Sequence, residues 1–151
     1  MRRDALALYI HLVWATWDRL PLLTPEIERP VHRVIASEAQ KMGCVLLALN
    51  SVPDHLHILV RVPSTLTVAK LVKQLKGVSS HFLNEVLRPD PPFKWQGFYG
   101  ASSVSHWDVE RIVAYIRRQK EHHQVGTLIP ELESVSEEVQ PEQPEEGVNE
   151  G

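Results

Sequence analysis

Hydrophobic patterning predicts an α+β fold in which helices pack on an antiparallel sheet. Apolar residues alternate with a period of two at 5–15 and 55–62, and they form a helical face in the segments that end near Leu87 and near His123. Along the 151 residues the order is strand, helix, strand, strand, helix, strand and a final helix. The first six elements follow the split βαβ order of ferredoxin-like folds. We therefore expect one ferredoxin-like domain plus a C-terminal helix.

The first half of the chain supplies three strands and one helix. Residues 5–15 alternate as a strand, and Thr24-Pro25-Glu26 has the cap, proline and acid typical of a helix start. We expect this helix to reach about Met42, with Pro30 awkward inside it and Gly43 ending it. Residues 44–52 and 55–62 read as a hairpin.

The second half supplies a helix, a strand and the final helix. Thr65 or Thr67 caps a helix that is expected to run to about Leu87. The aromatic segment 93–105 is predicted as a strand with glycine bulges. A last helix is expected from an Asp108 cap to about His123.

Charge is divided unevenly along the sequence. The whole chain has a net charge of −3, yet from Thr127 onward it has eight acidic residues and no lysine or arginine. The rest holds 16 basic and 11 acidic residues, a net charge of +5, which is compatible with a polyanionic partner. We divide the chain into a domain at 1–133 and an acidic, disordered tail at 134–151.

Composition narrows the location of the protein. The sequence has no apolar run of 18 residues and no signal-peptide pattern, so neither a membrane span nor secretion is expected. Its single cysteine, Cys44, suits a reducing cytosol.

The segment from Asp54 to Val60 carries the first chemical signal. His55 and His57 are two residues apart on a predicted strand, so their side chains point to the same face. Two neighbouring imidazoles can bind one divalent cation. An ordinary half-exposed pair is the more common explanation of such a motif.

The last helix carries the second signal. Tyr115, Gln119 and His122 are spaced at i, i+4 and i+7, which places them on one face beside the apolar stripe. A core tyrosine with its hydroxyl in water is the ordinary interpretation. The amide of Gln119, one turn further along the helix, could bind a cation, which favours a functional role for Tyr115.

Several residues are candidates for contacts to nucleic acid. The polar face of the second long helix presents lysines and hydroxyls, which either contact phosphates or simply face solvent. An aromatic in the segment after that helix could stack on a base, or belong to the core. The candidates are Lys70, Lys73, Lys76, Ser80, Arg19, Trp95 and Arg111.

Four blocks in order resemble a known family. They are Pro-Asp-His-Leu-His-Ile-Leu-Val, Leu-Val-Lys-Gln-Leu-Lys-Gly-Val-Ser-Ser, Trp-Gln-Gly-Phe-Tyr-Gly-Ala-Ser-Ser-Val-Ser and Tyr-Ile-Arg-Arg-Gln-Lys-Glu-His-His. Together they are similar to the single-tyrosine HUH transposases of small bacterial insertion sequences, over roughly residues 6–133.

The resemblance implies a metal-dependent DNA transposase that cleaves and rejoins single-stranded DNA through a 5′-phosphotyrosine intermediate. His55 and His57 match the pair that holds Mg²⁺ or Mn²⁺, Tyr115 matches the nucleophile, and Gln119 matches the third metal ligand. The implied partners are single-stranded DNA with hairpins at the element ends and a second copy of the chain. The homodimer can have composite active sites, and the implied location is the bacterial cytoplasm, at the nucleoid.

Two alternatives remain open at this point. One is a domesticated relative that binds structured single-stranded DNA or RNA without cleaving it. The other is an unrelated ferredoxin-like enzyme in which His55 and His57 bind zinc together with His122 or His123.

Overall fold

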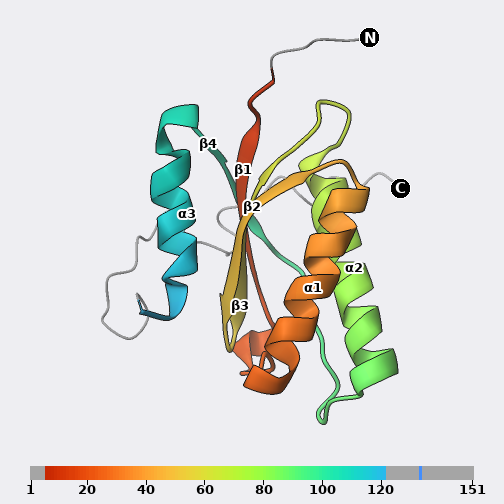
Figure 1. The fold of residues 1–151 in the computed structure, drawn as a ribbon. Helices are drawn as coiled ribbons and strands as arrows, with labels where there is room; N and C mark the ends of the chain where they lie inside the picture. Colours follow the sequence, from red (N-terminus) through yellow and green to blue (C-terminus); the bar gives the residue numbers. More distant parts are fainter. Residues whose placement is uncertain (1–5, 122–132, 134–151) are drawn as a thin grey trace.

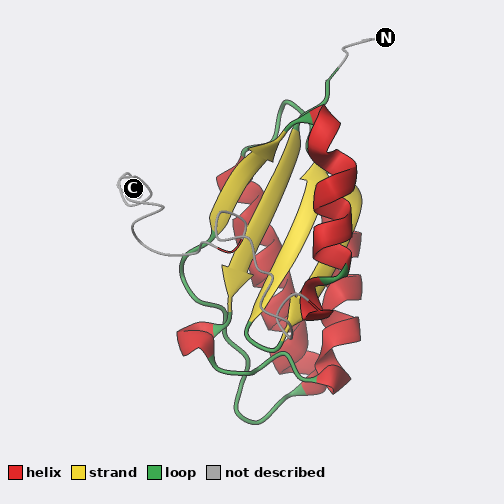
Figure 2. Ribbon diagram, turned by 90° about the vertical axis from the view of Figure 1, so that its left-hand side faces the viewer, coloured by secondary structure: helices red, strands yellow, loops and turns green. Residues whose placement is uncertain are grey.

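The computed structural model describes residues 6–121 and 133. A four-stranded antiparallel sheet with the order β2-β3-β1-β4 forms the centre of the domain. Helices α1 and α2 cover one face and α3 covers the other (Figure 1). Figure 2 looks onto the sheet from the α3 side and shows the strands side by side. This arrangement confirms the predicted α+β fold.

Strands β1 (Tyr9–Ala15) and β3 (His55–Arg61) form the middle of the sheet and separate two cores. On one face Leu12 and Trp14 pack with β3 residues under α1 and α2. On the other face Leu59 packs with Ile112 and Tyr115 of α3. The alternation expected for His55 and His57 holds, because both lie on the α3 side, opposite Leu56, Ile58 and Val60.

Helix α1 (Pro25–Lys41) begins after Thr24 and buries residues spaced four apart, Ile27, Val31, Ile35 and Ala39. It continues through Pro30, at the loss of one backbone hydrogen bond. Gly43 ends it in the left-handed region with φ of +88°, as expected of a helix C-terminal glycine. Strand β2 (Val45–Val52) then pairs with β3 through the Pro53-Asp54 turn.

Helix α2 (Val68–Phe82) is capped by Thr67, whose hydroxyl accepts a hydrogen bond from the Lys70 amide. A π-helical turn (Leu83–Leu87) extends it to the predicted end. Among the described residues, no helix is long and apolar enough to cross a lipid bilayer.

The fourth strand is shorter than predicted. Strand β4 is Gly100–Val104, whereas the sequence suggested 93–105. The Asn84 side chain binds both the amide and the carbonyl of Phe93, so hydrogen bonds from a side chain replace those of a sheet there. Trp95 makes only an isolated bridge with Thr16 before turning into the core. The prediction was wrong because aromatic content marked core packing in a loop rather than a strand.

The last helix is also shorter than predicted. A 3₁₀ turn (His106–Asp108) precedes α3 (Val109–Arg117), and Ser105 caps that turn by accepting from the Trp107 amide. Asp108 occupies the predicted cap position but makes no capping hydrogen bond. The helix breaks at Arg118 and helical structure resumes at 119–121. His122, His123 and the predicted tail at 134–151 lie outside the described residues.

Candidate active site

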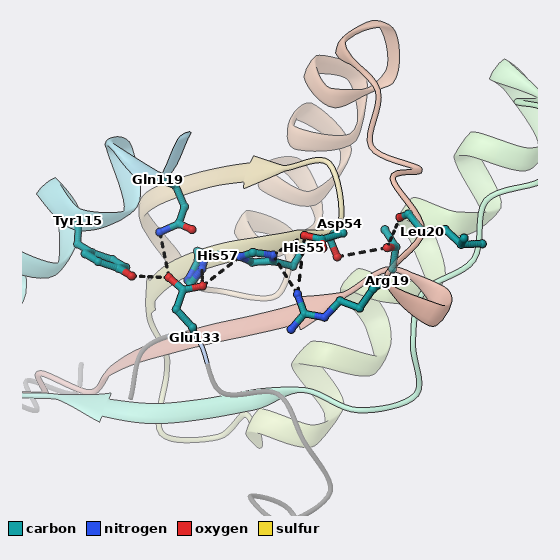
Figure 3. Close-up of polar contacts among 9 residues, drawn as sticks. Arg19, Leu20, Asp54, His55, His57, Tyr115, Gln119 and Glu133 are labelled. Carbon is teal, nitrogen blue, oxygen red and sulfur yellow. Dashed lines mark hydrogen bonds and ion pairs between the residues drawn. The ribbon is translucent and has the colours of Figure 1, made fainter. Parts of the chain in front are cut away.

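The α3 face of the sheet holds a compact polar cluster. His55 and His57 project from β3, and the Tyr115 side chain extends from α3 toward them from one side (Figure 3). The rings of His57 and Tyr115 are nearly perpendicular, with 6.2 Å between their centroids. His55, His57, Tyr115 and Gln119 are all buried. One chain therefore brings together the histidine pair, the tyrosine and the amide that the sequence singled out.

Glu133 lies at the centre of this cluster (Figure 3). Its Oε1 is 3.1 Å from Nε2 of His55 and 3.0 Å from Nε2 of His57. Its Oε2 accepts hydrogen bonds from the Tyr115 hydroxyl and from Nε2 of Gln119, the latter at 3.2 Å. Sequence reasoning missed Glu133, because it is one of several glutamates in an acidic segment and no spacing relates it to the histidines.

Both histidines are oriented through their other ring nitrogen. Nδ1 of His55 donates to the Asp54 carboxylate at 2.8 Å, and Nδ1 of His57 lies 2.8 Å from Nε2 of His11. His11 is buried and its ring stacks on that of His57. Such partners fix the tautomer of a metal-binding histidine. Neither His11 nor Asp54 is among the site residues predicted from the sequence.

The protonation of His11 determines what His57 can do. Burial, with the nearby charge of His57, lowers the pKa of His11 to about 3 against an opposing effect of Glu133. The His11 ring is therefore neutral at pH 7, and one of its two nitrogens can accept a hydrogen bond. When Nε2 of His11 accepts from Nδ1 of His57, the Nε2 lone pair of His57 is left for a cation.

The carboxylate and imidazole pKa values shift in opposite directions. Burial works to raise the pKa of Glu133, but hydrogen bonds from His55 and His57 outweigh it and hold that pKa far below its usual range. Burial of His55 works to lower its pKa, yet hydrogen bonds with Asp54 and Glu133 raise it overall. The cluster therefore favours an ionised carboxylate between the rings.

Arg19 is the predicted nucleic-acid contact that lies beside the histidine pair. Its guanidinium is 3.7 Å from the Asp54 carboxylate, with its side chain half exposed. Asp18 and Arg19 both have positive φ, 54° and 55°, in a turn (Trp17–Arg19) tied down by a hydrogen bond from the Asp18 amide to Gln96. Strained backbone of this kind is often found at functional sites.

The other predicted contacts are placed elsewhere. Lys70 and Lys73 are exposed on α2, across the sheet from the histidines (Figure 1). Lys76 and Ser80 line a groove of about 270 Å³ together with Lys94. Arg111 is exposed on α3, 3.6 Å from Asp108.

Trp95 belongs to the core. It is buried against Trp14 and Phe93, and its Nε1 donates to Ser79 at 2.9 Å. This placement agrees with the core alternative for Trp95, although one edge of its side chain lines the groove beside Lys76 and Ser80.

Comparison with known proteins identifies the family. The family model "Transposase IS200 like" matches residues 5–119. The chain belongs to this family. Membership in this family is inconsistent with the alternative of an unrelated zinc enzyme. Among the described residues, the side chain that joins the two histidines in a group able to hold a metal ion is Glu133.

Similar proteins agree with this assignment. The ISDra2 transposase TnpA of Deinococcus radiodurans is 27% identical over 70 residues, which cover 46% of this chain and 50% of that protein. The match thus spans half of that relative's length. The crystal structure of a candidate transposase from Deinococcus radiodurans R1 superposes with a TM-score of 0.63 and 27% identity, covering 79% of this chain and 95% of the other.

A second solved structure shares the fold. The REP-associated tyrosine transposase bound to a REP hairpin has a TM-score of 0.61 and 16% identity, covering 82% of this chain and 73% of the other. Both structures support the four-stranded antiparallel architecture.

Replacing Lys76 by methionine should remove a rise in stability above pH 8. Burial holds the pKa of the Lys76 ammonium at about 8, below the ordinary 10.5. Between these two values the unfolded chain binds a proton that the folded chain lacks, so the free energy of unfolding increases with pH. Urea denaturation of both proteins at pH 7.5 and 10 measures the difference. Lys73→Met should keep the rise, and an equal rise in Lys76→Met would contradict the assignment.

Proposed function

We propose that the protein is a metal-dependent transposase that cleaves and rejoins single-stranded DNA through a 5′-phosphotyrosine intermediate. The observation that carries this proposal is the convergence of His55, His57 and Tyr115 on one point, the Glu133 carboxylate. A tyrosine hydroxyl beside a pair of oriented imidazoles is the arrangement that phosphodiester transfer to a nucleophile needs.

The donor atoms suit a divalent cation such as Mg²⁺ or Mn²⁺. Nδ1 of each histidine is engaged, by Asp54 for His55 and by His11 for His57. Both Nε2 atoms face Oε1 of Glu133. The Gln119 side chain contacts the same Glu133 carboxylate, and its Oε1 is buried with no hydrogen-bond partner among the described residues. An orphaned buried amide oxygen is costly unless something binds it. We propose His55, His57 and Gln119 as metal ligands.

The roles of the protein groups follow from their positions. Tyr115 would attack the scissile phosphorus, forming the tyrosyl phosphoester as the bond to the 3′-oxygen breaks. A bound cation would offset charge on a non-bridging phosphate oxygen. The packing of Ile112, Tyr115 and Ile116 against Ala48 and Leu59 holds the nucleophile over the sheet. The released 3′-hydroxyl, or that of another strand, can then attack the phosphotyrosine and restore a phosphodiester.

The DNA path proposed from the charged residues runs around the sheet. Arg19 lies next to His55 and could contact a phosphate close to the cleaved bond. Lys70, Lys73, Lys76 and Ser80 lie on the far face, where they would hold a more distant part of the DNA. Arg111 would contact DNA near α3. We propose that this DNA carries hairpins at the element ends, as the hairpin bound by the REP-associated transposase suggests.

A covalent adduct with DNA is the expected product. The full chain is incubated with Mn²⁺ and end-labelled single-stranded oligonucleotides carrying the hairpins that flank its gene, then run on a denaturing gel. Tyr115→Phe should lower adduct formation by roughly a thousandfold or more, because no nucleophile remains. His55→Ala/His57→Ala should do the same. Tyr99→Phe, which removes a hydroxyl from a half-buried tyrosine of the other core, is the matched control.

Two outcomes of this assay would change the proposal. An adduct that survives Tyr115→Phe would contradict the assigned nucleophile. Hairpin binding without any adduct in the unsubstituted protein would replace the proposal with a domesticated, non-cleaving binder of structured single strands.

A homodimer is part of the proposal, and we infer that each chain acts with its own tyrosine. In this chain Tyr115 contacts the site formed by its own histidines. Mixing Tyr115→Phe protein with His57→Ala protein should therefore leave adduct formation at background. Recovery of about a quarter to a half of the activity would show a composite site, in which one chain supplies the tyrosine and the other the histidines. Size-exclusion chromatography with light scattering measures the oligomer in parallel.

A further inference from the structure

Glu133 marks the point on which the candidate site converges, but the function proposed above gives it no role of its own. Its carboxylate is mostly buried, with the side chain 14% exposed. Its two oxygens are divided between different partners, Oε1 between the histidine rings and Oε2 between Tyr115 and Gln119. A surface glutamate that had folded back by chance would not be expected to satisfy four buried groups at once.

The spacing around Oε1 fits a shared cation. Ligands at about 2.1 Å from an octahedral ion, at right angles to one another, lie about 3.0 Å apart. Oε1 is 3.1 Å and 3.0 Å from the two imidazole Nε2 atoms. These three atoms could therefore hold one ion with little movement, once the protons on the nitrogens are displaced. A set of two imidazoles and one carboxylate suits Mn²⁺ among the hard divalent ions.

We propose that Glu133 is a ligand of the divalent cation, completing the site formed by His55 and His57. This inference rests on the proposed function and adds a charged residue to it. The imidazoles and the Gln119 amide are neutral when they bind a metal, so Glu133 is the group that reduces the net charge of the site from +2 to +1. Its second oxygen contacts the Tyr115 hydroxyl and thereby sets the position of the nucleophile beside the ion.

The test is the affinity of the full chain for Mn²⁺ without DNA, measured by isothermal titration calorimetry and by the loss of the free-Mn²⁺ electron paramagnetic resonance signal. Glu133→Gln keeps the shape and removes the charge, so it should weaken binding at least about tenfold. Glu133→Asp keeps a carboxylate and should bind better than Glu133→Gln. Glu110→Gln removes an exposed carboxylate from α3 and should bind as the unsubstituted protein does.

Two results would overturn the assignment. Unchanged Mn²⁺ affinity in Glu133→Gln would mean that the carboxylate is not a ligand. Tighter binding would mean that Glu133 competes with the ion for the imidazoles. Thermal unfolding of each variant without metal shows whether it is folded. If Glu133→Gln does not fold, the comparison is made with Glu133→Ala, which also removes the carboxylate, and unchanged or tighter binding there has the same meaning.

His57→Ala separates this inference from the proposed function. If Mn²⁺ binding is lost in His57→Ala but unchanged in Glu133→Gln, the proposed metal site at the histidines stands and only the assignment of Glu133 as a ligand is wrong. Unchanged binding in His57→Ala would contradict the proposed metal site itself.

Discussion

The antiparallel pairing of β1 with β3 is the constraint on which the candidate site depends. In its register Val13 lies opposite His57 and Ala15 lies opposite His55, while His11 lies opposite Leu59. Because successive side chains alternate between faces, this register puts His11, His55 and His57 on the α3 side together. A slip of one residue would carry the histidines into the apolar core under α1 and α2 and bring Leu56 and Ile58 out. Apolar burial on one face therefore determines where the imidazoles point on the other.

The polar cluster is held together by mutual satisfaction of buried groups. Asp54 and His11 each engage the far nitrogen of one histidine, and Glu133 engages the near nitrogens. A buried polar group left without a partner costs about 1–3 kcal/mol, so removal of one member affects the others. The proposed DNA contacts are less interdependent, since Lys70 and Lys73 are exposed on α2, across the sheet from this cluster.

Local sequence patterns were sufficient to predict part of this arrangement. A strand with His-x-His fixes two parallel side chains, and helical spacing relates Tyr115 to Gln119, so both pairs could be found from the sequence. The family resemblance brought the two pairs to one site. His11 and Glu133 could not be found in the same way, because they are far from His57 in the sequence. His11 is 46 residues away from it and Glu133 is 76 residues away. A sheet order written out from the predicted topology would have placed β1 beside β3 and so drawn attention to His11.

The errors had physical causes as well. The aromatic residues Phe93 and Trp95 fit a strand by propensity, but they are buried as ring pairs in a loop fixed by Asn84. The final helix was extended too far because the apolar pattern carries no signal for the break at Arg118.

The proposed function requires that the two Nε2 atoms of the histidine pair share one divalent ion beside the Tyr115 hydroxyl. Anomalous diffraction from crystals of the protein soaked in Mn²⁺ tests it most directly. A shared ion should give a peak about 2.1 Å from Nε2 of both His55 and His57, on the side facing α3. A contradiction would be ordered imidazoles with no anomalous peak between them at an Mn²⁺ concentration that saturates binding in solution.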